Sequence, residues 1–315
     1  MRKILVTGGA GNIGSALVAA LLKTDNTSVT VVDNLSTGML EKLPLEHPNL
    51  NFIKADVNER LEITEVMLST KFDYVFHYAA YVGVKRTQEN PVRVLKDIDG
   101  IKNVLNLVKS TSVKRVFYSS SSEVYGEPVE LPQHEETTPL NSRVPYAVVK
   151  NVGEAFFRSF NKSYDIDYTI FRFFNTYGPN QSKDFVITKF IKAALKNEDI
   201  TMFGDGLQTR TFCYVEDNIA ACIKIFEKEL QVNQVINIGG AIEITIKELA
   251  ELVIELTKSS SKITYLPPLA EGDMTRRLPD NSKMRAVLNR ELLPVREGIL
   301  KMLSNPDFME RMKKD

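Results

Sequence analysis

The sequence is poor in the features that mark metal-binding, secreted, membrane and nucleic-acid-binding proteins. Its 315 residues include only two cysteines, Cys213 and Cys222, whose spacing fits neither a zinc site nor a disulfide framework. Lys plus Arg and Asp plus Glu number 40 each, so a formal net charge of zero gives no reason to expect nucleic acid or an anionic membrane as a general partner. No apolar run is long enough for a membrane span, and the apolar stretch at the amino terminus is too short for a signal peptide. We therefore expect a cytoplasmic globular protein without a bound metal.

The stretch from Ser142 to Phe157 carries the clearest chemistry. Tyr146 and Lys150 are four residues apart, so they share one face if the stretch is a helix. A free tyrosine titrates near pH ~10, and acting as a base near pH ~7 requires roughly 4 kcal/mol of differential stabilisation, part of which a nearby ammonium supplies. Ser142 is a candidate N-cap and Pro145 suits a first helical turn. An ordinary amphipathic helix would give the same spacing, so the pair needs support from the rest of the chain.

The first 40 residues supply that support, because they predict a dinucleotide site. An apolar run over residues 3–7 precedes the glycines Gly8, Gly11 and Gly14, and helical periodicity follows over residues 15–23. Glycines between a strand and a helix let the backbone approach a pyrophosphate at the helix amino terminus. Asp33 lies 19 residues beyond Gly14, at the end of a second predicted strand, where its carboxylate would accept hydrogen bonds from an adenosine ribose. Since a carboxylate repels a 2′-phosphate and no arginine follows it, NAD is favoured over NADP.

Small and polar residues follow three further predicted strands. Ala55-Asp56-Val57 follows the strand at 51–54, and Tyr78-Ala79-Ala80 follows the strand at 72–77. Asp56 is either an adenine contact or a helix cap, and we interpret His77 as structural. The run from Ser119 to Gly126 leaves the strand at 115–119, and open α/β sheets bind ligands at the carboxyl ends of their strands.

Strands and helices alternate as far as the strand at 168–173, which predicts an α/β fold with a Rossmann-like, doubly wound parallel sheet. The alternation then becomes irregular. We expect an NAD-binding domain over 1–175 that carries the catalytic residues, and a smaller carboxyl-terminal α/β lobe over 176–315. A helix at 245–256 in this lobe has a capping-box pattern, Thr245 with Glu248.

In order and spacing, these motifs resemble the extended short-chain dehydrogenase/reductase family, which includes nucleotide-sugar epimerases and dehydratases. The resemblance spans nearly the whole chain. It rests on the segments 7–14, 33–35, 77–80, 118–126, Tyr146 with Lys150, 172–179, 204–210 and 277–280.

The resemblance implies a role for each candidate site residue. Tyr146 would be the general base for the C4 hydroxyl of a nucleotide-diphosphate sugar, with Lys150 on the nicotinamide ribose and Ser121 orienting the proton. Arg210 and Arg277 would clamp the diphosphate, unless they form surface salt bridges. The residues expected at NAD are Gly8, Gly11, Asn12, Ile13, Gly14, Asp33, Asn34, Asp56, Val57, Tyr78, Ala79, Ala80, Ser119, Tyr146, Lys150 and Phe174, the last beside the nicotinamide; those expected at the substrate are Ser121, Ser122, Asn175, Arg210 and Arg277.

The fate of the 4-keto sugar is less clearly indicated. Ser122-Glu123 and the segment 276–280 resemble the uronate decarboxylases, whereas residues 80–86 resemble the 4-epimerases. Ser122 stands where dehydratases have an aspartate, which disfavours dehydration. Glu123 is a candidate catalytic residue, or alternatively caps its loop or balances a lysine. We expect a 4-epimerase; the alternatives are a uronate decarboxylase, a 4-dehydrogenase that stops at the keto sugar, and an NAD-sensing module without catalysis.

Two further expectations follow from the resemblance. Asp97 replaces an asparagine that is common in the family, and a carboxylate cannot donate that residue's hydrogen bonds unless it is protonated. Family members commonly form homodimers through two long helices of each subunit, here predicted at 91–110 and 147–160.

Overall fold

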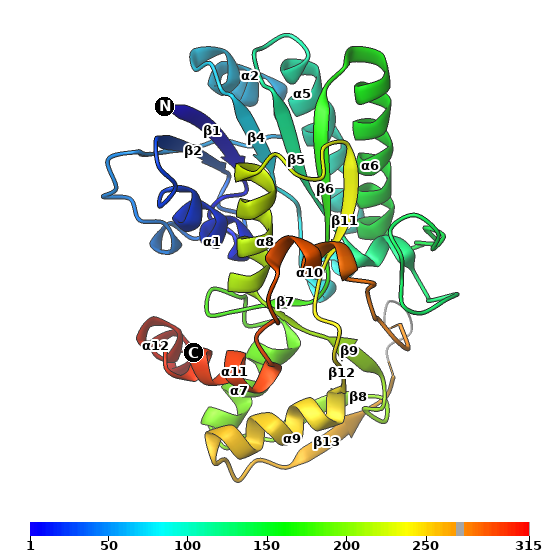
Figure 1. Cartoon of the computed structure of the whole chain (residues 1–315). Helices are drawn as coiled ribbons and strands as arrows, with labels where there is room; N and C mark the ends of the chain where they lie inside the picture. Colours follow the sequence, from blue (N-terminus) through cyan, green and yellow to red (C-terminus); the bar gives the residue numbers. More distant parts are fainter. Residues whose placement is uncertain (269–273, 315) are drawn as a thin grey trace.

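The computed structural model of the chain describes residues 1–268 and 274–314 (Figure 1). Within them, an upper lobe holds a large sheet with helices on both faces, and a lower lobe holds short strands and helices. In chain order the elements are β1 (Arg2–Thr7), α1 (Asn12–Leu21), β2 (Thr27–Asp33), η1 (Leu40–Lys42), β3 (Leu50–Lys54), α2 (Arg60–Ser69), β4 (Tyr74–His77), α3 (Val84–Glu89), α4 (Pro91–Leu95), α5 (Asp97–Val108), β5 (Arg115–Ser121), η2 (Ser122–Tyr125), α6 (Pro145–Tyr164), β6 (Asp167–Phe173), β7 (Thr176–Tyr177), α7 (Val186–Leu195), β8 (Ile200–Phe203), β9 (Thr209–Thr211), β10 (Cys213–Tyr214), α8 (Val215–Glu227), β11 (Gln234–Ile238), β12 (Glu243–Thr245), α9 (Ile246–Thr257), β13 (Ile263–Leu266), α10 (Ser282–Leu288), α11 (Val295–Leu303) and α12 (Pro306–Lys313).

The large sheet runs in the order β11-β6-β5-β4-β1-β2-β3, and every neighbouring pair in it is parallel. The strand order reverses between β1 and β4, which is where a doubly wound sheet opens a crevice for a ligand. The doubly wound parallel sheet predicted from the sequence is therefore confirmed.

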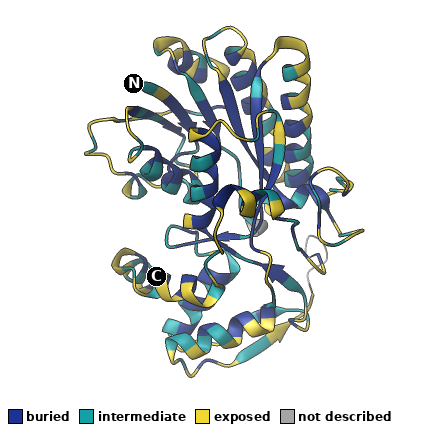
Figure 2. Cartoon of the chain, viewed as in Figure 1, coloured by how far each residue is buried: buried dark blue, intermediate teal, exposed yellow. Residues whose placement is uncertain are grey.

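Side chains of the central strands are buried on both faces of the sheet (Figure 2). On β1, Ile4 and Val6 pack into one apolar cluster, which includes residues of α1 and α8. Leu5 points the other way, into a cluster with residues of α2, α5 and α6. This alternation is the period-2 pattern of a strand with a helical layer on each side. Because both faces are covered, the sequences of the central strands are continuous apolar runs.

The lower lobe has its own apolar core. Residues of α7, α9, α11 and α12 pack there with the parallel pair β8 and β13. Thr245 and Glu248 form the predicted capping box at the start of α9: the Thr245 hydroxyl accepts from the Glu248 N–H at 3.0 Å, and the Thr245 N–H donates back to the glutamate at 2.8 Å.

Two local predictions were wrong. The helix expected at 91–110 is divided into α4 and α5, which meet at Lys96. Ser142 does not cap α6, because the helix begins later, with Val144 as its N-cap and Pro145 in its first turn. The Pro145 ring favours extended backbone at the preceding residue, which places the boundary there. Among the described residues, no helix is both long and apolar enough to span a membrane.

Candidate active site

A cavity of about 1650 Å³ opens at the carboxyl ends of the central strands. Its walls come from the loops that follow β1, β2, β3, β4 and β5, from α6, and from the first part of the lower lobe. The cavity thus lies at the reversal of strand order and extends between the two lobes.

The glycine loop forms one wall and is shaped by close backbone approach. Gly8 has φ +71°, and a Cβ there would lie 2.6 Å from the backbone of Ala79. A Cβ on Gly14 would lie 2.2 Å from the carbonyl oxygen of Gly8. Gly11 is the N-cap of α1 and has no side chain to occupy the helix amino terminus, which leaves backbone N–H groups facing the cavity as in a pyrophosphate site.

Asp33 lies beside this loop at the end of β2 and is buried. Its carboxylate accepts from the N–H of Leu35 at 2.8 Å and of Ala10 at 3.0 Å. Burial raises the pKa of Asp33, partly offset by these two backbone hydrogen bonds. The carboxylate is thus rigidly positioned on the cavity wall, as a ribose diol requires.

Asp56 belongs to the same wall. It accepts from Asn34 Nδ2 at 2.9 Å and from the N–H of Asn58 at 2.9 Å, and both Asn34 and Asp56 line the cavity. The alternative that Asp56 caps a helix is wrong, because α2 begins at Arg60 with Glu59 as its N-cap.

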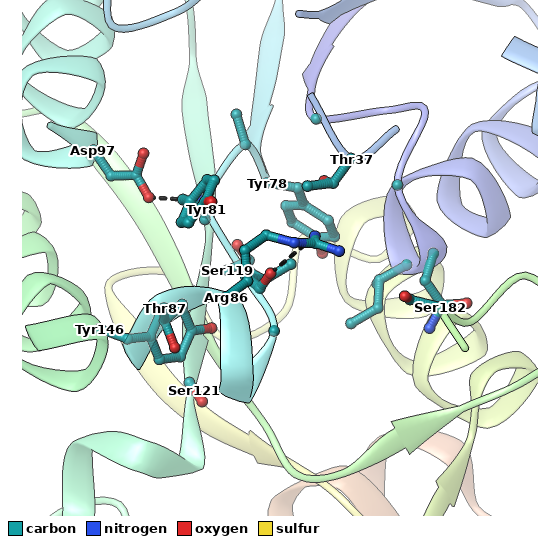
Figure 3. Close-up of a pocket in the computed structure, with 18 of the residues that line it drawn as sticks. Thr37, Tyr78, Tyr81, Arg86, Thr87, Asp97, Ser119, Ser121, Tyr146 and Ser182 are labelled. Carbon is teal, nitrogen blue, oxygen red and sulfur yellow. Dashed lines mark hydrogen bonds between the residues drawn. The ribbon is translucent and has the colours of Figure 1, made fainter. Parts of the chain in front are cut away.

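Tyr146 and Lys150 lie on α6, and both line the opposite half of the cavity, as predicted. Figure 3 shows the Tyr146 ring near Ser121. The Lys150 ammonium donates to the carbonyl oxygen of Ser119 at 2.6 Å and lies 5.8 Å from the centre of the Tyr146 ring. Ser121, at the end of β5, lies close enough to the Tyr146 hydroxyl to lower its pKa. The three side chains therefore form one contiguous proton-handling group.

The direction of the Tyr146 pKa differs from the expectation. Burial raises the pKa of Tyr146 above its ordinary value, and the negative charge of Glu123 raises it further, whereas the Ser121 hydrogen bond lowers it. Burial also lowers the pKa of Lys150 to about 8. In the chain alone the phenol is thus protonated near neutral pH, because desolvation outweighs the charges around it.

Glu123 and Arg277 form an ion pair on the cavity wall near Tyr146. The Arg277 Nη1 and Glu123 Oε1 atoms are 2.7 Å apart, and the arginine side chain is only 7% exposed. Ser121 Oγ accepts from the Glu123 N–H at 3.2 Å and so anchors the short helix η2. The pair is partly desolvated, so the surface-salt-bridge alternative for Arg277 is wrong, and the partner of Glu123 is an arginine rather than a lysine.

Two predicted site residues do not line the cavity. Phe174 is fully buried against Val124 and Tyr125, and Phe173, one residue earlier, lines the cavity instead. Arg210, in β9, is buried and donates to the Thr209 carbonyl at 2.7 Å, away from the cavity lining. The other predicted residues all line the cavity: Gly8, Gly11, Asn12, Ile13, Gly14, Asp33, Asn34, Asp56, Val57, Tyr78, Ala79, Ala80, Ser119, Ser121, Ser122, Glu123, Tyr146, Lys150, Asn175 and Arg277.

Sequence reasoning missed a contact between the lobes across the cavity. Arg86 on α3 pairs with Asp184, at 3.2 Å, from the loop before α7 (Figure 3 shows Arg86 extending across the opening). Lys42 of η1 also lines the cavity, near Asp33, and burial lowers its pKa to about 8. The only signal for Arg86 was a basic residue in the loop after the fourth strand.

Comparisons with known proteins agree with this geometry. The profile of the NAD dependent epimerase/dehydratase family matches residues 4–239. The chain is 36% identical to UDP-glucuronic acid decarboxylase 6 of Arabidopsis thaliana, over 98% of this chain and 90% of that one. Among solved structures, it resembles the UDP-glucose 4-epimerase of Thermotoga maritima with UDP-glucose (31% identity, TM-score 0.91, 99% and 100% of the two chains). It also resembles the UDP-glucuronic acid 4-epimerase of Bacillus cereus with UDP-glucuronic acid and NAD (28% identity, TM-score 0.88, 99% and 100%).

The glycine cradle, the free amino terminus of α1 and the buried Asp33 carboxylate fit the pyrophosphate and adenosine ribose of a dinucleotide. Together with a family profile that covers most of the sequence, they establish that this chain is an enzyme of the NAD-dependent epimerase/dehydratase family.

Proposed function

We propose that the enzyme oxidises C4 of a nucleotide-diphosphate sugar and then returns the hydride to the opposite face of the ring, as a 4-epimerase does. The observation that carries this proposal is the convergence of Tyr146, Ser121 and Lys150 in the cavity that also holds the glycine loop. At about 1650 Å³ the cavity exceeds the roughly 300–1,000 Å³ of a single small-ligand site, so a second nucleotide has room beside the dinucleotide.

In this proposal Tyr146 removes the proton of the C4 hydroxyl, and Ser121 orients the two oxygens. Lys150, anchored on the Ser119 carbonyl, would hold the nicotinamide ribose of bound NAD, and its ammonium adds positive charge beside the phenol. When bound, NAD supplies the hydride acceptor, and its cationic nicotinamide ring adds positive charge that favours the Tyr146 phenolate. Since Tyr146 can give the proton back when the hydride returns to the keto sugar, one acid–base residue serves both half-reactions.

In this proposal two parts of the chain divide the binding work. Residues 1–175 carry the cofactor wall and the catalytic group, and residues 176–315 mainly hold the nucleotide-sugar. The division of the chain at residue 175 does not coincide with the two lobes, because β11 joins the large sheet and α8 packs on it. Asn175 at the boundary is fixed by a 2.9 Å hydrogen bond from its amide to the Thr211 carbonyl, and Arg277 presents a buried guanidinium. Both line the cavity and are suited to the substrate diphosphate.

The state of Glu123 favours epimerisation. Dehydration and decarboxylation need an acid–base group besides the tyrosine, and the Glu123 carboxylate is paired with Arg277 instead. The same pair supports one second candidate: a uronate carboxylate that displaces Glu123 from Arg277 would leave the glutamate beside the sugar, as a uronate decarboxylase requires. A 4-dehydrogenase stays as an alternative, whereas the family rules out the NAD-sensing module without catalysis.

The test is incubation of the NAD-loaded enzyme with UDP-glucose and UDP-glucuronic acid, with products analysed by mass spectrometry and NMR. An isomer of unchanged mass supports the 4-epimerase, loss of carbon dioxide from the uronate selects the decarboxylase, and accumulation of NADH with a keto sugar selects the dehydrogenase. If no product forms with these or other nucleotide-sugars, the proposed C4 chemistry fails.

Replacing the base separates catalysis from binding. Tyr146→Phe removes the phenolic oxygen and should lower kcat by roughly 10²–10⁴-fold with little change in NAD affinity. Tyr164→Phe is the matched control, because Tyr164 ends the same helix and is 53% exposed. Equal loss of turnover and NAD binding in Tyr146→Phe would contradict the assigned role.

We further propose a cytoplasmic homodimer. The dimer would form through α4, α5 and α6, which pack against one another and leave Val92 and Leu95 exposed on α4. Covering such residues is a common reason for association. A monomeric mass by light scattering at micromolar concentration would contradict the dimer.

A further inference from the structure

Asp97 is a half-buried carboxylate in the cavity that the mechanism above does not use. It is the first residue of α5, and its Oδ2 atom accepts from the N–H of Tyr81 at 2.7 Å. Its Oδ1 atom accepts from Asn58 Nδ2 at 3.4 Å. Figure 3 shows the side chain directed at Tyr81, in the loop after β4. Within the described ranges, no Lys, Arg or His nitrogen lies within 4.0 Å of this carboxylate, so it is held by neutral donors.

The charges around Asp97 come from two neighbouring segments. Lys150 on α6 is the cation that stabilises its ionised form, and Asp56, after β3, is an anion that opposes it. Burial raises the pKa of Asp97, and the Tyr81 N–H and Lys150 lower it. In return Asp97 raises the pKa of Lys150 and of Tyr146. The carboxylate is therefore within electrostatic reach of both residues.

Two other charged groups face Tyr146 from different elements. Glu123 on η2 raises its pKa, and Arg277, before α10, lowers it. These two neutralise each other as an ion pair, whereas in the part of the chain that the structure describes Asp97 has no cation bound directly to it. Of the two carboxylates that act on Tyr146, Asp97 is therefore the less compensated one, offset through space by Lys150.

The topology indicates which half of NAD lies there. The adenosine ribose belongs at Asp33 after β2, and the pyrophosphate belongs at the glycine loop after β1. The nicotinamide nucleoside must then extend toward β4 and β5, on the other side of β1. Tyr81, Ser119 and Asp97 line that side of the cavity.

We propose that Asp97 is an anionic positioning residue that makes the site prefer oxidised over reduced cofactor. An oxidised nicotinamide ring is a cation and a reduced one is neutral, so a fixed carboxylate stabilises only the oxidised form. Destabilising NADH relative to NAD helps an enzyme that must give its hydride back. The inference rests on NAD binding and not on the fate of the sugar, although it deepens the proposed 4-epimerase.

The experiment measures the dissociation constants of NAD and NADH without any nucleotide-sugar, at near-neutral pH. Asp97→Asn keeps an oxygen that can accept from the Tyr81 N–H but removes the charge. We expect the ratio Kd(NAD)/Kd(NADH) to rise by roughly tenfold, the effect of one charge at moderate distance in a partly screened site. Asp99→Asn is the matched control, because Asp99 lies two residues further along α5 and is exposed, 3.4 Å from Lys102. Its ratio should match that of the unmodified protein.

A second variant keeps the inference falsifiable if Asp97→Asn does not fold. Asp97→Glu retains the charge, so its ratio should stay within about twofold of the unmodified value. An unchanged ratio in Asp97→Asn would overturn the proposal, because the carboxylate would then have no electrostatic effect on the cofactor. A shift of the ratio in Asp97→Glu as large as that in Asp97→Asn would also overturn it, because the shape of the side chain and not its charge would then be the cause. Since no sugar is present, these outcomes are independent of whether the enzyme proves to be an epimerase.

Discussion

The most specific prediction about stability concerns Glu154. It lies one turn beyond Lys150 on α6, is fully buried, and accepts hydrogen bonds from Ser120 Oγ at 2.7 Å and from Arg172 Nε and Nη2 at 2.8 and 2.7 Å. Arg172 in turn donates to the Tyr125 hydroxyl at 2.8 Å. One carboxylate thus joins α6 to β5 and β6 directly behind the catalytic residues.

Glu154→Gln should destabilise the fold by about 3–5 kcal/mol. The substitution removes the charge but little volume, so the cost is that of leaving the Arg172 guanidinium buried without its counter-charge. Arg172 is 1% exposed and cannot turn to solvent. Arg158 offers no compensation, because it is a second cation that pairs with the same glutamate, at 3.1 Å. The amide oxygen of glutamine can retain part of the hydrogen bonding, which places the expected loss toward the lower end of the range.

Urea unfolding of the two forms checks the value through the shift in midpoint. The control is Glu251→Gln on α9, whose ion pair with Lys247 is 4.0 Å long and exposed, and which should cost under about 1 kcal/mol. A loss below about 1 kcal/mol in Glu154→Gln, equal to the control, would refute the reasoning that this pair anchors the catalytic helix.

Two predictions concern pH. Burial lowers the pKa of His77 to about 3, so on acidification the unfolded chain binds a proton before the folded chain does. The stability present above pH ~6.5 should therefore fall by up to ~5 kcal/mol as the pH approaches about 3. His77→Gln should flatten this slope in acid unfolding experiments, and an unchanged slope would contradict the assignment. The pKa of Lys150 is lowered to about 8, so kcat/KM should fall above that pH as the ammonium beside Tyr146 loses its charge. In Lys150→Arg the guanidinium stays charged, so any remaining activity should persist to higher pH. An identical alkaline fall in this variant would rule out Lys150 as the source of the fall.

The parts of the site that the sequence predicted depend on local geometry. The glycine loop, Asp33 and the Tyr146–Lys150 pair each follow from spacing within one strand, turn or helix. Such patterns carry their own structural context, because a strand followed by glycines and a helix leaves few alternatives for the backbone. They line one cavity because the parallel sheet brings the carboxyl ends of its strands to one edge.

The parts that were missed or wrong depend on contacts between distant segments. Glu123 and Arg277 are far apart in the sequence, and only the folded chain shows that they pair. Phe174 was placed at the nicotinamide, but consecutive residues at the end of β6 point to opposite sides, and Phe173 faces the cavity. The resemblance to the family predicts that Arg210 binds the substrate diphosphate. In the structure its strand, β9, pairs with β12, and the Arg210 side chain is buried away from the cavity lining.

The opposite pKa shifts of Tyr146 and Lys150 have one cause with a mechanistic consequence. Burial favours the neutral form of both groups, raising the pKa of the phenol and lowering that of the amine. The Asp97 carboxylate strengthens the first shift and opposes the second, so it keeps the ammonium charged while holding the phenol protonated. In the proposed mechanism, the positive charge that favours the Tyr146 phenolate would therefore come from outside the chain. Oxidised NAD, held by the glycine loop and Asp33, would supply this charge and the neutral reduced cofactor would not, so the ionisation of Tyr146 would depend on the redox state of the cofactor.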